Sequence, residues 1–190
     1  MKNNLKLRAR HIIKDFFDYM NYKDGEDVDW YEFEDYPAYL GCGISRFCLE
    51  LDDDYIIKVS KDKMSNRYRN YRANNGTDQS LTEIKVYEQC PQEYKYLLNP
   101  IIDMGLCDGY IFIIQRKCKI VSDYFDMNSL QVAMEDMGRE DEYYDLESDI
   151  MEFCSWFNLS ETDILEYTSN VGVNDDDNIV ITDYGFSLAH

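Results

Sequence analysis

The sequence predicts an α+β fold, with a sheet-rich first half followed by a helical second half. Short runs of β-branched and aromatic residues, separated by glycine and acidic turns, gather before residue 120. Apolar residues at helical spacing dominate from there to residue 158, and one short strand follows near the end. The 190 residues, 45% of them apolar, suffice for one domain or two tightly packed lobes. We expect a division into residues 1–119 and 120–190.

The first part of the chain is expected to hold one long helix and then three strands. Leu5, Phe16 and Met20 belong to an apolar series at helical spacing, with basic residues between its members. The run Tyr-Ile-Ile-Lys-Val-Ser is typical of a strand. The expected order is a helix at 5–21, an acidic loop at 22–35, a strand–turn–strand at 37–51, a tight turn at 52–54 and a strand at 55–60.

The rest of the chain is expected to contain helices and three further strands. Ser160, three residues before Asp163, is typical of a helix start. The expected order is a basic mobile loop or frayed helix at 61–76, a helix at 81–89, strands at 100–104 and 110–115, a connector at 115–119, helices up to 158, and a strand at 179–182.

The net charge of -19 argues against direct binding of DNA, RNA or an anionic membrane, because these partners require clustered Lys and Arg. The same charge suits an ordinary acidic protein, a protein with a basic partner, or a mimic of nucleic acid. Acidic runs such as Glu140-Asp141-Glu142 and Asp175-Asp176-Asp177 contrast with a basic island at residues 58–72.

The six cysteines contain no Cys-x-x-Cys pair, so no zinc site is expected. We expect buried free thiols in a reducing cytoplasm. His11 and His190, the two histidines, offer little to a histidine-based mechanism. The sequence shows no apolar leader and no apolar run long enough to span a membrane, which favours a cytoplasmic protein.

Two features of the sheet-rich half suggest phosphate binding. Gly41 and Gly43 lie in a strand–turn–strand, where glycines let backbone N–H groups approach phosphate oxygens. The alternative is a hairpin turn that requires glycine. Lys58 lies on a strand between β-branched residues, so its ammonium points to one face of a sheet. The alternative is a surface lysine on an edge strand.

Two further features complete a pattern of charged and polar groups. Glu83, on the helix that follows Lys58, is placed to pair with it, and Glu88 is the competing candidate. Asp183 follows a buried strand and precedes Tyr184-Gly185, where a carboxylate suits Mg²⁺. Asn170 would supply a neutral oxygen to the same metal.

In this order, the four features resemble the protein-kinase pattern of a Gly-rich loop, a strand Lys, a helix Glu, an Asn and an Asp-aromatic-Gly turn. The motifs Asn-Val-Gly and Asp-Tyr-Gly are similar to those of small kinase-like proteins of phages and bacteria. The resemblance implies a sheet-rich N-lobe and a minimal helical C-lobe. It implies that Gly41, Gly43, Lys58 and Glu83 form the ATP site and that residues 115–119 form a hinge. It also implies that Asn170 and Asp183 bind Mg²⁺.

The chain departs from this pattern where the catalytic Asp is expected. Leu165 stands five residues before Asn170, and Leu cannot accept a proton. Asp163 and Glu166 are the candidates for a relocated base. Arg46 replaces the third glycine of the loop, where it would either reach a phosphate or block closure. The sequence ends at His190, so we expect a truncated lobe with no platform for a peptide substrate.

These features lead to three functional hypotheses. The favoured one is a catalytically impaired kinase-like protein that binds nucleotide, a protein partner or both, with a viral origin as one option. The second is an acidic inhibitor that imitates nucleic acid and binds a basic host-defence or DNA-binding protein, as anti-CRISPR or anti-restriction proteins do. The third is an active small kinase with a relocated base. Whether the protein is an enzyme stays open, with a pseudokinase favoured.

Overall fold

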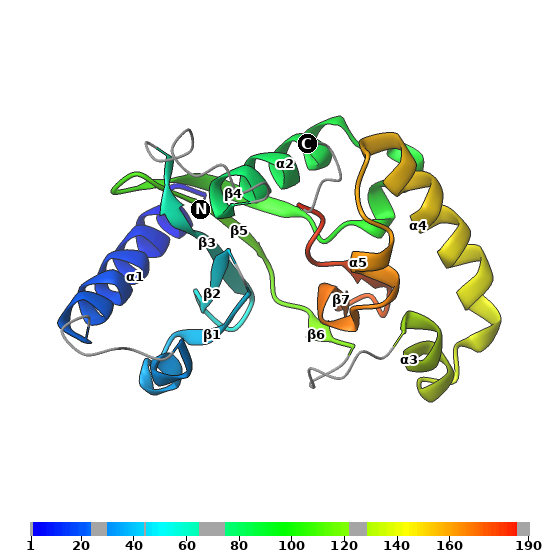
Figure 1. Ribbon diagram of the computed structural model, residues 1–190, viewed down its shortest axis with the longest axis horizontal. Coiled ribbons are helices and arrows are strands. Elements are labelled where there is room, and N and C mark those ends of the chain that lie inside the picture. Colours follow the sequence, from blue (N-terminus) through cyan, green and yellow to red (C-terminus); the bar gives the residue numbers. More distant parts are fainter. Residues whose placement is uncertain (1, 24–29, 44, 65–74, 122–128, 186–190) are drawn as a thin grey trace. The chain divides into compact units, whose positions relative to one another are not determined.

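The computed structural model describes residues 2–23, 30–43, 45–64, 75–121 and 129–185 (Figure 1). It shows a mixed α/β protein with an antiparallel sheet and several helices. The chain divides into two compact units, each with its own core: Met1–Ser80 with Ile101–Lys117, and Leu81–Pro100 with Cys118–His190. The sequence-based division at residue 119 assigns residues 81–100 to the first half, whereas here they pack with the second.

The first unit is built on a five-stranded antiparallel sheet with the strand order β1-β2-β3-β5-β4. β3 is therefore the central strand, and hydrogen bonds join it to β2 and β5 on its two sides. Apolar alternation and a tight acidic turn produce this arrangement, since Asp52 Oδ1 accepts the N–H groups of Asp54 and Tyr55. The strands are β1 (Tyr39–Cys42), β2 (Arg46–Glu50), β3 (Tyr55–Lys63), β4 (Ile101–Cys107) and β5 (Tyr110–Arg116).

One long helix, α1 (Lys2–Lys23), packs against this sheet, and a 3₁₀ turn, η1 (Trp30–Asp35), lies beside β1. The buried stripe of α1 contains Ala9, Ile13 and Phe16. The Phe16 ring contacts five aromatic rings at centroid distances of 5.0–6.0 Å, among them Phe47 of the sheet. Aromatic rings bury large areas and prefer such tilted contacts, so this cluster anchors the first core.

Three basic residues of α1 bind the sheet. Lys6 forms an ion pair with Asp103 at 2.9 Å, and Arg8 pairs with Asp52 at the same distance. Arg10 donates from Nε to the carbonyl oxygen of Leu106 at 3.1 Å. These contacts tie the helix to β4 and to the β2–β3 turn.

Helix α2 (Gly76–Gln89) begins five residues before the helix that the sequence predicts. Its first turn is held by β3, because Asp62 Oδ1 accepts the N–H of Thr77 at 3.2 Å. A Cβ at Gly76 would overlap the carbonyl oxygen of Ser45, so only glycine permits this approach. The segment expected to be a loop or frayed helix therefore starts as strand up to Lys63. Residues 65–74 lie outside the described part.

The second unit combines a small antiparallel sheet, β6-β7-β8, with short helices. The sequence predicts β8 but not β6 or β7, which are too short to show a period. The elements are η3 (Gln92–Leu97), β6 (Lys119–Ile120), α3 (Leu130–Asp136), η4 (Glu140–Glu142), α4 (Tyr143–Phe157), α5 (Thr162–Leu165), η5 (Thr168–Asn170), β7 (Val171–Val173) and β8 (Ile179–Ile181).

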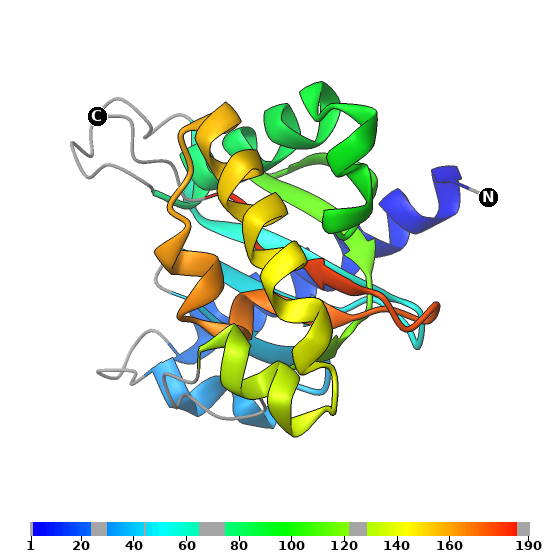
Figure 2. The same cartoon turned by 90° about the vertical axis from the view of Figure 1, so that its right-hand side faces the viewer.

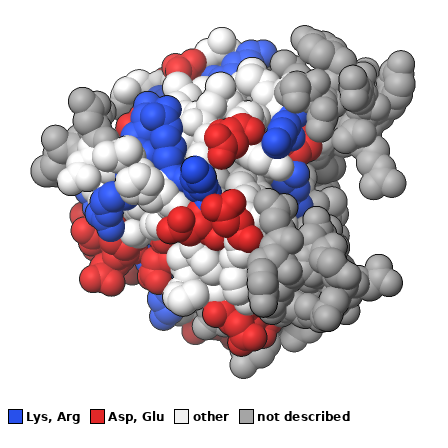
Figure 3. All heavy atoms as spheres, turned by 90° about the vertical axis from the view of Figure 1, so that its left-hand side faces the viewer, with Lys and Arg blue, Asp and Glu red and all other residues white. Residues whose placement is uncertain are grey.

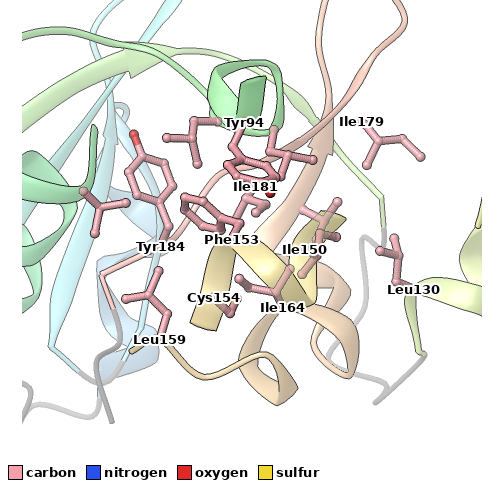
Figure 4. Close-up of a cluster of buried hydrophobic side chains, with 14 of the residues drawn as sticks. Tyr94, Leu130, Ile150, Phe153, Cys154, Leu159, Ile164, Ile179, Ile181 and Tyr184 are labelled. Atoms are coloured by element: carbon pink, nitrogen blue, oxygen red, sulfur yellow. The ribbon is translucent and has the colours of Figure 1, made fainter. Parts of the chain in front are cut away.

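The core of the second unit lies where α4 packs beside β8 (Figure 4). Ile150, Phe153 and Cys154 of α4 are buried together with Ile179 and Ile181 of the strand. Their spacing on α4 is the helical one that the sequence predicts, so the amphipathic pattern alone selects the buried face of this helix.

Two expectations from the sequence concern the cysteines and membrane-spanning segments. All six cysteines are free thiols, and Cys90, Cys107 and Cys154 are buried. None of the helices in the described ranges is both long and apolar enough to cross a bilayer.

Cys154 should make the second unit sensitive to alkali. Burial raises the pKa of its thiol to about 12, from an ordinary value of 9.0, and the nearby Glu161 and Asp163 add to the shift. The raised pKa favours folding below pH 9, and this contribution is lost as the pH rises towards 12. Urea unfolding at pH 8, 10 and 11.5 should show declining stability. Cys154→Ala should flatten the decline, and an identical slope in the variant would contradict the assignment.

Candidate functional site

The strand that carries Asp183 is held on both edges. β8 pairs with β7 on one side, and Ile181 forms a parallel bridge with Leu98 on the other. The Asn99 N–H donates to the Ile181 carbonyl at 3.0 Å. Because all three residues of β8 are buried, the backbone that enters Asp183 has little freedom.

The buried ring of Tyr184 fixes the backbone that follows Asp183. Tyr184 is almost completely buried, and its hydroxyl donates to the carbonyl oxygen of Asn99 at 3.0 Å. Asp183 itself is half-buried, and its Oδ1 accepts the N–H of Gly185 at 3.3 Å. The aromatic residue of the Asp-Tyr-Gly turn therefore anchors the turn, a role that its position next to a buried strand could have indicated.

Asn170 joins three segments of the second unit. Its carbonyl oxygen accepts the N–H of Thr182 at 2.8 Å and that of Asp183 at 3.4 Å. Its side-chain Nδ2 donates to the carbonyl oxygen of Asp163 at 2.7 Å. Only the amide nitrogen can donate, so this bond sets the orientation of the side chain. The structure thus brings the backbones of Asn170 and Asp183 into contact.

The two candidates for a relocated base differ in their surroundings. Ser160 Oγ accepts the N–H of Asp163 at 3.2 Å, which confirms the predicted helix start, and α5 follows. Asp163 is half-buried on the turn that Asn170 holds, whereas Glu166 is exposed. Leu165 packs against the apolar core. Leu165 stands five residues before Asn170, where the kinase pattern has its catalytic Asp. The Asn170 side chain bonds instead to the carbonyl of Asp163, seven residues before it.

Lys58 lies at the centre of the first unit's sheet. It pairs with Cys48 on β2 and with Ile113 on β5, and its side chain is 8% exposed. Its neighbours Ile57 and Val59 belong to the core beneath α1, so alternation directs Lys58 to the opposite face. The alternative of an exposed lysine on an edge strand is therefore wrong.

The two glycines of the β1–β2 turn have different reasons to be glycine. Gly41 adopts φ +148° at an irregularity in the β1–β2 register, a conformation that favours glycine. Gly43 has no such backbone angle, and a Cβ there would meet no atom within 4 Å. The N–H of Gly43 donates to the Arg46 carbonyl at 3.0 Å, and its carbonyl accepts from Lys61 Nζ at 2.6 Å. The hairpin therefore needs Gly41 but leaves Gly43 unexplained.

The remaining predicted residues lie in different parts of the chain. Glu83 of α2 is completely buried, whereas its competitor Glu88 is exposed. Arg46 is a buried residue of β2 paired with Ser60. Gly41, Gly43 and Lys58 belong to the first unit, and Glu83, Asn170 and Asp183 to the second. From the basic island, Lys61 and Lys63 lie on β3, and Arg67, Arg69 and Arg72 fall outside the described residues.

Among the described residues, no group of three or more His, Cys, Asp or Glu side chains could hold a metal ion. One carboxylate and one amide oxygen, from Asp183 and Asn170, are a small set of hard ligands. Mg²⁺ accepts such a set when substrate phosphates and water complete its six oxygen positions.

Asn170→Ala should destabilise the second unit by about 1–2 kcal/mol, because it leaves the Asp163 carbonyl without this donor. Asn178→Ala is the matched control, since the bonds that Asn178 makes in the β7–β8 turn come from its backbone N–H and carbonyl oxygen. Urea unfolding followed by circular dichroism measures both. Equal stability of the two variants would show that the Asn170 side chain does not hold the turn.

Comparisons with known proteins give only structural similarities. No family model matches the sequence, and no curated protein matches it. Solved structures of WbdD are similar over part of the chain: monomeric WbdD has 18% identity and a TM-score of 0.45, with 78% of this chain and 35% of that chain covered. A structure described as the bifunctional kinase-methyltransferase WbdD gives 18% identity, coverage of 78% and 32%, and a TM-score of 0.39. The chain thus spans about a third of the length of these proteins, and a likeness at this level does not extend to activity, substrate or partners.

Proposed function

We propose that this is a kinase-like protein that binds a nucleotide together with Mg²⁺ and in which phosphotransfer is impaired. The observation that carries the proposal is the position of Asn170, whose backbone accepts the N–H of Asp183 and whose amide bonds to Asp163. This arrangement supports a metal site in which Asp183 supplies a carboxylate oxygen and Asn170 an amide oxygen.

The oxygen chemistry of these two residues suits the proposed metal. Mg²⁺ is a hard cation that binds carboxylates, carbonyl oxygens, water and phosphate oxygens. Because Nδ2 of Asn170 is committed to Asp163, Oδ1 is the atom that the side chain can offer to a cation. The ion would neutralise phosphate charge, which an acidic protein otherwise repels.

Burial of Lys58 supports a role in holding phosphates. A lysine that is 8% exposed on a central strand requires nearby negative charge or strong acceptors, because desolvating an ammonium is costly. Glu83 is also buried, whereas the competing Glu88 is exposed. Neither the backbone angle φ nor crowding requires glycine at position 43. A close approach of this backbone to a phosphate would require it, which supports that role for Gly43.

Impairment follows from Leu165. Its side chain cannot accept a proton or orient a hydroxyl, and it packs against the core of the second unit instead. A site that holds a metal and a nucleotide without a positioned base would bind its ligand and turn it over slowly.

Nucleotide binding should raise the melting temperature of the protein only when both ATP and Mg²⁺ are present. Binding to the native state stabilises it by about 2.7 kcal/mol when the ligand is at 100 times its Kd. Asp183→Asn, which removes the charged ligand but keeps the shape, should abolish the shift.

Asp176→Asn is the matched control for this titration, because it removes the same charge from an exposed turn between β7 and β8. It should retain the full response. A wild-type protein that ATP with Mg²⁺ leaves unchanged would refute the nucleotide proposal.

Residual phosphotransfer through Asp163 is the second candidate function. It is favoured by one observation, that Asn170 holds the turn which carries Asp163 next to the proposed metal ligand. Asp163 is half-buried there, which suits a base better than the exposed Glu166.

Radiolabel transfer from γ-labelled ATP separates the two candidates. If Asp163 acts as the base, Asp163→Asn should reduce the rate by about 10²–10⁴-fold, while Glu166→Gln keeps it. Asp183→Asn must also remove the signal, since a contaminating kinase would ignore it. No transfer by the wild type would leave the impaired, binding-only function.

A further inference from the structure

The outward face of α4 carries large apolar side chains that the fold does not bury. Tyr144 is 69% exposed, Trp156 64% and Met151 52%. The first two are the most exposed large apolar residues in the described part of the chain. Figure 2 shows α4, in yellow, crossing the front of the view with no other helix or strand before it. Exposed aromatic side chains on one helix face are typical of contact surfaces.

Helical spacing divides this face into two adjacent stripes. Tyr144, Ser148, Met151 and Ser155 form one, and Asp145, Asp149, Glu152 and Trp156 form the other. We call these eight residues the α4 face. The acidic stripe has like charges three and four residues apart, and α4 contains no Lys or Arg to offset them. The repulsion between these carboxylates costs helix stability.

Tyrosines from η3 hold two of the carboxylates in place. The Tyr96 hydroxyl donates to Asp149 Oδ2, and Glu152 is near enough to Tyr94 to raise the pKa of its phenol. Burial is the main reason that the pKa of Tyr94 rises to about 12, and Glu152 contributes. Carboxylates fixed in this way lose less side-chain entropy when a cation binds them.

The acidity of the protein is concentrated in the second unit. Its described part contains four basic residues, namely Lys85, Lys95, Lys119 and Arg139. Lys95 bonds to the Tyr87 carbonyl, and Arg139 pairs with Glu142. By contrast, on the face of the molecule drawn in Figure 3, Lys and Arg are interspersed with Asp and Glu. The field around the α4 face is therefore negative.

We propose that the α4 face docks a basic amphipathic segment of a partner protein. Lys or Arg side chains of the partner would meet Asp145, Asp149 and Glu152, and its apolar side chains would cover Tyr144, Met151 and Trp156. Negative charge excludes nucleic acid and anionic membranes as occupants. The proposal does not depend on nucleotide binding, because none of these residues belongs to the metal or phosphate groups described above.

Trp156 provides a local reporter for the experiment. The chain has two tryptophans, so Trp30→Phe leaves Trp156 as the single one. The probe is a synthetic amphipathic peptide made only of Lys and Leu, with Leu at helical spacing. Its binding should shift Trp156 emission to shorter wavelengths, and a peptide with Glu in place of Lys should have no effect. An unchanged emission on binding of the Lys peptide would overturn the proposal.

Two neutralised variants separate local docking from general attraction to an acidic protein. Asp145→Asn with Asp149→Asn and Glu152→Gln, which keeps acceptors for both tyrosines, should weaken binding about tenfold. Asp175→Asn, Asp176→Asn and Asp177→Asn remove the same charge from the β7–β8 turn and should weaken it less than about twofold. Equal weakening by both sets would refute docking on α4.

The apolar part is tested by Tyr144→Ser with Met151→Ser, both at exposed positions that leave the core intact. This variant should lose most of the affinity while circular dichroism shows the same helix content. Sedimentation tests the other occupant, a second copy of this chain. A wild-type dimer that this variant abolishes would assign the face to self-association and overturn the proposal.

Discussion

The hydrogen bonds of Asn170 hold together the part of the molecule on which the candidate site depends. Its backbone carbonyl closes the end of β8 onto β7, and its side chain ties α5 to the same point. A single residue therefore sets the positions of Asp163 and Asp183 relative to each other. Buried β8 on one side and the buried Tyr184 ring on the other prevent the turn from relaxing. Such bracing is what a metal site needs, because its ligands must be held before the ion arrives.

In the first unit, the packing on one face of the sheet determines where Lys58 lies. The aromatic cluster around Phe16 and the ion pairs of α1 occupy one face of the sheet. Alternation along the central strand β3 then sends Lys58 to the other face, where it is buried despite its charge. Because α1 uses its own basic residues to bind the sheet, these cations serve the fold, and Lys58 is set apart from them.

Long periodic segments were predictable, and short irregular ones were not. The helices α1 and α4 each bury one face, so their apolar residues recur at a visible period. The strand β3 is a run rich in β-branched residues, which is a strand signal of its own. β6 and β7 have two and three residues, too few for any period, and are created by pairing with β8. Residues 81–100 join the second core through Val86, Leu97 and Leu98, a choice that no local signal along the chain carries.

For the candidate site, the sequence by itself determined which chemical groups are present and in what order: two glycines, a strand lysine, a helix glutamate, and the Asn-Val-Gly and Asp-Tyr-Gly segments. It also placed leucine where a base was expected. Only the tertiary structure decided that Lys58 is buried on a central strand, that Glu83 and not Glu88 is buried, and that the Asn170 side chain bonds to the Asp163 carbonyl. The physical reason is that residue types follow from the chain, whereas burial and hydrogen-bond partners depend on segments distant in sequence that meet only after folding.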